Sequence, residues 1–158
     1  MSELAQTAED RRSIDGATQR DLLARAREMA ANAYVPYSDF PVGAAAMASD
    51  GAVYTGCNVE NASYGLTICA ERSAIVAAIG AGAREIVAIA VSAPKVPLTT
   101  PCGACRQVLN EFRPLAEDMM LILDDRGDGE VISLESLLPR AFGPRNLDTA
   151  KSETPTAD

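Results

Sequence analysis

Two short stretches, CAER at residues 69–72 and PCGAC at residues 101–105, decide the fold and the chemistry expected of this chain. Together they read Cys-x-Glu, a spacer, and then Pro-Cys-x-x-Cys. Catalytic zinc takes three protein ligands and leaves its fourth position to water. Three cysteines with one nearby carboxylate are therefore the residues that a hydrolytic zinc site needs.

The spacing of these residues gives each one a role. Cys102 and Cys105 are three residues apart, so at the start of a helix they lie on one face and can bind one ion. Cys69 supplies the third thiolate. Glu71 is two residues from Cys69, and residues with this spacing do not lie on the same face of a helix. We therefore expect Glu71 to transfer protons beside the metal instead of competing as a ligand.

Helical patterns follow both motifs, over residues 70–81 and 103–112. The thiolates are thus expected at helix N-termini, where the positive end of the helix dipole lowers the pKa of a cysteine. One Zn²⁺ ion with three thiolate ligands forms a site whose formal charge is negative. We expect Arg72 to offset part of this charge by donating a hydrogen bond to a thiolate. The alternative is an arginine exposed on the helix surface.

The remaining cysteine is Cys57, and the chain contains no histidine. A closed structural zinc site would need four ligands, with Cys57 as the fourth. Because Cys57 lies in an alternating apolar run, we interpret it as a packing residue. The lack of histidine also excludes Ser-His and Cys-His catalytic triads. Acid–base catalysis is left to a carboxylate, a lysine, a tyrosine or a cysteine.

Composition places the chain among soluble globular proteins. Its 158 residues, 47% hydrophobic and 23% charged, suit one domain with a core. The net charge of −8 argues against binding to nucleic acid polymers, which need basic patches. No apolar run reaches the length of a membrane span. The cysteine pattern, with no secretion signal, favours metal binding in a reducing cytoplasm.

The expected elements follow the order α-β-β-α-β-α-β-β-α. Helices are expected at 18–32, 70–81, 103–112 and 133–138, and strands at 41–47, 52–58, 85–92, 119–123 and 130–132. This order predicts an α/β fold, a three-layer α-β-α sandwich with a five-stranded mixed sheet. Thr18 is expected to cap the first helix. Flexible tails at 1–16 and 143–158 are expected to flank one domain at 17–142.

Five blocks in this order resemble the small, homotetrameric type of zinc-dependent cytidine deaminase. They are PYSDFPVGAA (36–45), GCNVENASYG (56–65), CAERSA (69–74), PCGACRQV (101–108) and SLLPRAF (136–142). The metal motifs also match the zinc deaminase signature. The resemblance implies one zinc ion per subunit and hydrolytic deamination of cytidine and deoxycytidine to uridine and deoxyuridine, with release of ammonia, as in pyrimidine salvage. Glu71 would take a proton from water and pass it to N3 of the base.

The resemblance also implies a nucleoside site within each subunit. Asn58 and Glu60 correspond to residues that hold the ribose hydroxyls. Phe40 corresponds to a residue that packs on the nucleoside. The backbone of Ala70 corresponds to one that reads the amino edge of the base.

Other residues are implied in subunit contacts and around the thiolates. Ala62, Tyr64 and Phe142 correspond to positions that complete a neighbouring subunit's pocket, which implies a homotetramer. Gln107, like the arginine of the CAER motif, corresponds to a residue around the thiolates. Arg140 departs from the family, which often has a glycine there.

Three alternatives remain open at this stage. A deaminase of another cytosine compound, such as blasticidin S or a modified nucleoside, would share the chemistry, although the NVEN segment favours an ordinary ribose. A nucleic-acid-editing deaminase is disfavoured by the net charge of −8 and by the lack of a basic, aromatic groove. A non-catalytic zinc module or nucleoside-binding oligomer would have no need for Glu71.

Overall fold

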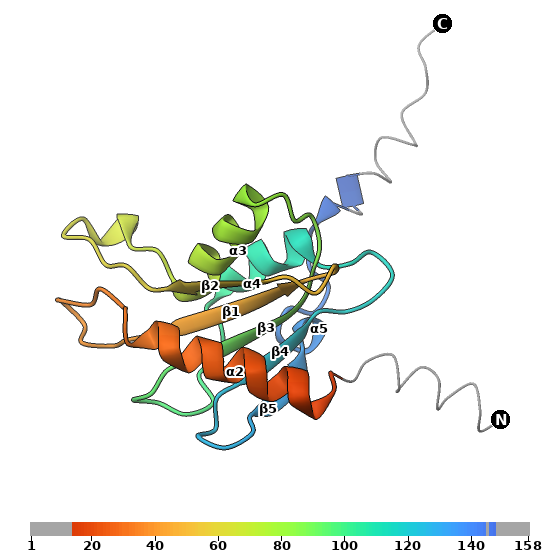
Figure 1. The fold of residues 1–158 in the computed structure, drawn as a ribbon. Helices are drawn as coiled ribbons and strands as arrows, with labels where there is room; N and C mark the ends of the chain where they lie inside the picture. Colours follow the sequence, from red (N-terminus) through yellow and green to blue (C-terminus); the bar gives the residue numbers. More distant parts are fainter. Residues whose placement is uncertain (1–13, 145, 148–158) are drawn as a thin grey trace, which may run out of the picture.

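Short apolar strands form a five-stranded sheet at the centre of the protein, with the strand order β2-β1-β3-β4-β5 (Figure 1). The computed structural model describes residues 14–144 and 146–147. Neighbouring strands are antiparallel except β3 and β4, which are parallel. The predicted mixed sheet is therefore confirmed. The strands are β1 (Gly43–Ala48), β2 (Val53–Cys57), β3 (Ile86–Ser92), β4 (Met120–Leu123) and β5 (Glu130–Ser133).

Helices cover both faces of this sheet (Figure 1). One face carries α2, and the other carries α3 and α4, so the predicted three-layer sandwich is also confirmed. The helical elements are α2 (Gly16–Ala30), the short 3-10 helix η1 (Tyr64–Leu66), α3 (Ala70–Gly80), α4 (Gly103–Phe112) and α5 (Leu134–Leu137).

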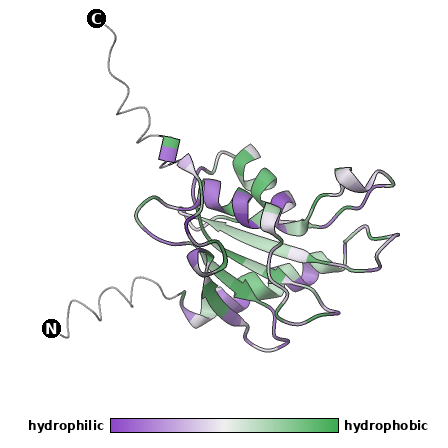
Figure 2. Cartoon of the chain, turned by 180° about the vertical axis from the view of Figure 1, so that it is seen from behind, coloured by the Kyte–Doolittle hydropathy of each residue, from purple (hydrophilic) through white to green (hydrophobic). Residues whose placement is uncertain are grey.

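The buried core consists of two apolar clusters, one on each face of the sheet. Ala44 and Ala46 of β1 belong to the cluster that includes α3 residues, whereas Ala45 belongs to the cluster that includes α2 residues. This division follows from the alternation of side chains along a strand. Figure 2 shows hydrophobic residues concentrated along the strands between the helical layers.

Two glycines let the helices lie directly on the strands. A Cβ atom on Gly43 would lie 2.0 Å from the carbonyl oxygen of Ala26 in α2. A Cβ atom on Gly56 would lie 2.4 Å from the backbone nitrogen of Ala74 in α3. Because no side chain fits at Gly56, the first turns of α3 are held against the end of β2.

The first helix begins earlier than the sequence predicted. Asp15, not Thr18, is its N-cap, and the Asp15 carboxylate accepts hydrogen bonds from the backbone N–H groups of Ala17 and Thr18. The Thr18 hydroxyl donates to the same carboxylate, at 2.6 Å. The expected cap was wrong because an aspartate three residues earlier can accept from two free N–H groups at once.

The tails predicted at 1–16 and 143–158 lie largely outside the described residues, which exclude 1–13 and 148–158. Of the described residues in these ranges, Ile14 packs against a core cluster and Gly143 is buried. Among the described residues, none of the helices has both the length and the apolar character needed to cross a membrane.

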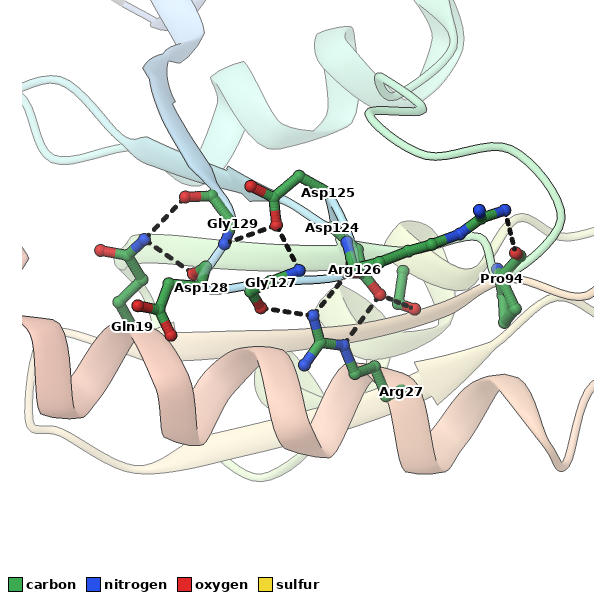
Figure 3. A network of polar contacts seen from close by, with 10 residues as sticks. Gln19, Arg27, Pro94, Asp124, Asp125, Arg126, Gly127, Asp128 and Gly129 are labelled. Carbon is green, nitrogen blue, oxygen red and sulfur yellow. Dashed lines mark hydrogen bonds and ion pairs between the residues drawn. The ribbon is translucent and has the colours of Figure 1, made fainter.

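A buried carboxylate joins α2 to the sheet at the end of β4 (Figure 3). Asp124 is 6% exposed and accepts hydrogen bonds from Arg27 Nε and Nη2, at 3.0 and 2.6 Å. It also accepts from the Ser92 hydroxyl and the Arg126 backbone. The Arg126 side chain in turn donates to the carbonyl of Pro94. The network therefore anchors the loop that leads to Cys102.

The hydrogen bonds from Arg27 lower the pKa of Asp124 to about 2. Its stabilising effect is therefore present above the unfolded-state pKa of about 4 and is lost as the pH falls toward about 2. We predict that Asp124→Asn lowers the free energy of unfolding by about 2 kcal/mol at neutral pH, because Arg27 loses a charged partner. Urea unfolding measured from about pH 7 to about pH 3 should show that the difference in free energy of unfolding between wild type and Asp124→Asn becomes smaller as the pH falls.

The control is Asp21→Asn, which removes an exposed pair with Arg25 on the surface of α2. Such pairs contribute little, and the change should be below about 0.5 kcal/mol. A gap for Asp124→Asn that stays constant over the whole pH range would contradict the prediction.

Candidate zinc centre and active site

Three cysteine sulfurs from two sequence motifs meet in one cluster. The Sγ atoms of Cys69, Cys102 and Cys105 all lie within 4.8 Å of one another, and those of Cys69 and Cys102 are 4.0 Å apart. A tetrahedral zinc ion with Zn–S bonds of about 2.3 Å places its sulfurs roughly 3.8 Å apart. The three sulfurs therefore fit zinc closely. Cys105 is buried and Cys102 is exposed, so the cluster opens toward the surface.

Helix starts position all three sulfurs. Cys69 is the N-cap of α3 and Cys102 is the N-cap of α4, and neither side chain caps its own helix. Cys105 lies in the first turn of α4, on the same side as Cys102. The free N–H groups and positive dipole ends of both helices thus face the sulfurs and favour negative charge there. This is the arrangement predicted from the spacing.

The local contacts favour a thiolate at Cys69. A hydrogen bond from Cys105 lowers the pKa of Cys69 to about 5, with a further contribution from Arg72, although burial acts in the opposite direction. The pKa of Cys105 is raised because its thiol donates to Cys69 and is buried. Zinc binds cysteine as the thiolate, so binding releases the thiol protons. The lowered pKa of Cys69 favours the deprotonated form that zinc needs.

Arg72 lies beside the sulfur cluster. Its Nη2 atom donates to the carbonyl of Thr67 at 3.0 Å and to Cys69 Sγ at 3.6 Å. Its Nε atom is buried and has no hydrogen-bond partner among the described residues. The alternative of an exposed surface arginine is therefore wrong, and the expected contact with a thiolate is present.

Glu71 is the buried carboxylate of the site. It lies in the first turn of α3, two residues after Cys69, and is 5% exposed. Burial raises the pKa of Glu71, and the negative charge of Cys69 adds to the effect. A raised pKa brings the proton affinity of this carboxylate closer to that of the groups with which a general acid–base catalyst exchanges protons.

Asn58 fixes the chain that enters β1. Its Oδ1 atom accepts from the backbone N–H of Val42 at 2.8 Å, and its Nδ2 atom donates to the carbonyl of Phe40 at 2.9 Å. The residue after Asn58 pairs with Ile68, immediately before the first cysteine ligand. The predicted ribose-binding segment and the sulfur cluster are therefore brought to the same end of the sheet.

Glu60 holds the loop that precedes β1. Its Oε2 atom accepts from the backbone N–H groups of Tyr37 and Ser38, at 2.9 and 3.2 Å. Hydrogen bonding from Ser38 lowers the pKa of Glu60, which keeps it ionised. The rings of Tyr37 and Tyr64 meet edge to face with centroids 5.7 Å apart. The two polar side chains expected to contact ribose, Asn58 and Glu60, thus both hold the segment that precedes β1.

The residues expected to complete a neighbouring pocket are exposed in this chain. Tyr64 is 74% exposed and Phe142 is 63% exposed, and Ala62 is exposed as well. Gln107, expected around the thiolates, donates its side-chain amide to the carbonyl of Phe142 at 2.9 Å.

Two further observations concern residues outside the predicted site. Asn110 was missed, although its buried side-chain amide also donates to the carbonyl of Phe142. The signal was its position three residues after Gln107, on a shared helical face. Cys57 lies outside the sulfur cluster, and its Sγ atom is 3.5 Å from the carbonyl of Asn32.

Comparison with known proteins agrees with this geometry. The family model described as "Cytidine and deoxycytidylate deaminase zinc-binding region" matches residues 17–121. The chain belongs to the cytidine deaminase family. The cytidine deaminase of Sporosarcina psychrophila is 44% identical over 133 residues, covering 84% of this chain and 96% of that protein. That of Mycobacterium tuberculosis (strain H37Rv) is 52% identical over 126 residues, covering 80% and 90%.

Solved structures give the same result. The crystal structure of cytidine deaminase from Burkholderia pseudomallei matches with a TM-score of 0.71 and 46% identity, over 77% of this chain and 97% of that one. The resemblance to cytidine deaminases seen in the five sequence blocks is thus confirmed, and with it the α/β fold. The prediction of zinc as cofactor is also confirmed, and the cysteines of the CAER and PCGAC motifs form the cluster that can hold it.

We predict that replacing Cys69, Cys102 or Cys105 by alanine reduces bound zinc from about one ion per chain to a small fraction, because two thiolates cannot complete the site. Zinc should be measured by mass spectrometry on purified, dialysed protein. Cys57→Ala is the matched control and should retain its zinc. Loss of zinc from Cys57→Ala, or full retention in any of the other three variants, would contradict the assignment.

Proposed function

We propose that this protein catalyses the hydrolytic deamination of cytidine and deoxycytidine to uridine and deoxyuridine. In this reaction the oxygen of water is added at C4 of the base and the amino nitrogen leaves as ammonia. The observation that carries the proposal is the buried Glu71 carboxylate next to three sulfurs that fit one zinc ion. Membership of the cytidine deaminase family supports it.

Zinc, when bound, acts as a Lewis acid and lowers the pKa of water, so that a nucleophile is available near neutral pH. Cys69, Cys102 and Cys105 would hold the ion and leave its fourth position open on the exposed side of the cluster. The helix N-termini and Arg72 would offset part of the thiolate charge, which otherwise weakens the Lewis acid.

Glu71 would carry the protons of the reaction. Its carboxylate accepts one proton as water attacks, delivers it to N3 of the cytosine ring, and then assists departure of the amino group. Burial supports this role, because the raised pKa brings its proton affinity closer to that of the groups it must protonate. Its place in the first turn of α3 keeps the carboxylate fixed beside the sulfurs.

Asn58 and Glu60 would bind the ribose. Glu60 uses one carboxylate oxygen for the backbone of the loop before β1, and its other oxygen would accept from a hydroxyl group. Asn58 fixes the backbone of Phe40, whose ring would pack on the nucleoside. The backbone of Ala70, the first residue of α3, would read the amino edge of the base.

The enzyme would act as a cytoplasmic homotetramer in pyrimidine salvage. Ala62, Tyr64 and Phe142 would complete the pocket of a neighbouring subunit, and their exposure in the single chain supports this placement. Exposed aromatic side chains are available to pack against a partner, and aromatic residues are enriched at protein–protein interfaces.

The direct test is ultraviolet absorbance during incubation of the zinc-loaded protein with a panel of cytosine compounds. We expect loss of the cytosine band with cytidine and deoxycytidine, and no change with cytosine in a single-stranded oligonucleotide. Turnover of blasticidin S alone would move the assignment to another cytosine substrate. No turnover of any compound by a protein with one zinc per chain would leave only a binding role.

We predict that Glu71→Gln retains zinc but lowers kcat by at least roughly 10²–10⁴-fold, because the amide cannot carry the proton. The control is Glu85→Gln, an exposed glutamate immediately before β3, which should keep wild-type kcat. A Glu71→Gln protein as active as wild type would show that this carboxylate does not take part in the reaction.

A further inference from the structure

Side chains of α4 hold the segment that runs from the last residue of α5 to Phe142. Arg106 Nη1 donates to the carbonyl of Leu137 at 2.9 Å. Gln107 Nε2 and Asn110 Nδ2 both donate to the carbonyl of Phe142, at 2.9 and 3.1 Å. We refer to the two amides of Gln107 and Asn110 as the Phe142 clamp. Both ends of segment 137–142 are thus fixed to one helix.

The clamp holds the backbone of a residue whose side chain is mostly exposed in its own chain. Asn110 is 5% exposed, whereas Phe142 is 63% exposed. Burying an amide is costly unless it is hydrogen-bonded, and the carbonyl of Phe142 supplies that bond. Because the exposed ring contributes little to this chain's core, packing of the ring does not account for the anchoring. The structure instead presents an aromatic side chain outward from a fixed backbone.

Gly143 makes the clamp possible. A Cβ atom at this position would lie 2.5 Å from Asn110 Nδ2. Any larger residue at position 143 would push the amide away from the carbonyl it binds. Because the obstructed atom is the far end of a side chain, the amide could swing aside while the fold is kept.

The helix that carries the clamp also carries two of the zinc ligands. Cys102 and Cys105 occupy the N-cap and first turn of α4, and Asn110 follows in the same helix. At a rise of 1.5 Å per residue, Asn110 lies about 7.5 Å along the axis from Cys105. A helix this short is effectively rigid, so the placement of the ring is tied to the placement of the metal ligands.

We infer that Asn110 is a positioning residue that, with Gln107, sets the Phe142 ring to close the substrate pocket of a second copy of this chain. The inference rests on the proposed function, in which that ring completes a neighbouring pocket. Asn110 does not touch the substrate. It acts through the backbone of Phe142, so its loss should affect nucleoside binding more than the chemical step.

Two variants loosen the clamp in different ways. Asn110→Leu replaces the donor by an apolar side chain of similar size, and Gly143→Ala displaces the same amide sterically. For both we expect KM for cytidine to rise about fivefold, the effect of one lost hydrogen bond, with kcat within about twofold of wild type. Zinc content, thermal unfolding and oligomeric state should stay near wild type. Gln107 is left unchanged because of its expected place around the thiolates.

A double-mutant cycle separates positioning from a general structural role. If Asn110 acts through the ring, Asn110→Leu should change KM by less than about twofold in a Phe142→Ala background, since the two changes remove one effect. Equal and independent effects in both backgrounds would overturn the inference, and so would unchanged KM in both Asn110→Leu and Gly143→Ala. Glu111→Gln, an exposed neighbour on α4, is the matched control and should behave as wild type.

The cycle also keeps this inference distinct from the proposed function. A Phe142→Ala enzyme with wild-type KM and kcat would overturn the positioning role while deamination itself stands. Absence of deamination by the wild-type protein would overturn the proposed function first.

Mixed oligomers test whether the ring acts on a second copy. Chains carrying Glu71→Gln keep Phe142 but lack the proposed proton carrier, and they would be co-expressed with chains carrying Phe142→Ala. Oligomers that contain both chains should show some sites with wild-type KM, because an intact ring reaches an active neighbour. If every active site keeps the KM of Phe142→Ala, the ring acts within its own chain and the inference is wrong.

Discussion

The concentration of thiolate charge at the start of two helices is the constraint on which the rest of the structure depends. Cys69 and Cys102 occupy the N-caps of α3 and α4, so both helices must begin at the same place. Gly56 allows α3 to lie on β2, and Arg106 ties the start of α4 to the carbonyl of Pro101. The Asp124 network adds a second anchor on the loop between β3 and α4 (Figure 3).

The same constraint brings the other polar groups of the site close to the three sulfurs. The segment that contains Asn58 and Glu60 is joined through Val59 to Ile68, just before α3 begins, so the polar segment is fixed beside the start of the helix. Glu71 is buried because the first turn of α3 packs against the sheet, and burial is what raises its pKa. One packing arrangement therefore sets the metal ligands, the carboxylate and the expected ribose contacts.

Local sequence patterns were sufficient to predict the features that depend on residues close together in the chain. The Cys-x-x-Cys at the start of α4 and the strand that contains Ala45 could be predicted because neighbours along the chain determine them. The sequence could not show whether Asp15 or Thr18 is the N-cap of α2, because aspartate and threonine are both favoured at this position. Only the folded structure shows which one is used. The role of Asn110 could not be predicted from the sequence because its hydrogen-bond partner lies 32 positions later in the chain. Such contacts depend on tertiary structure.

The central claim is an open zinc site with three thiolates, and X-ray absorption spectroscopy on the zinc-loaded protein tests it most directly. The account predicts three sulfur ligands at about 2.3 Å and one lighter atom in the fourth position. Four sulfur ligands would mean that Cys57 closes the site and that the metal is structural. That result would contradict the catalytic role assigned to the cluster and to Glu71.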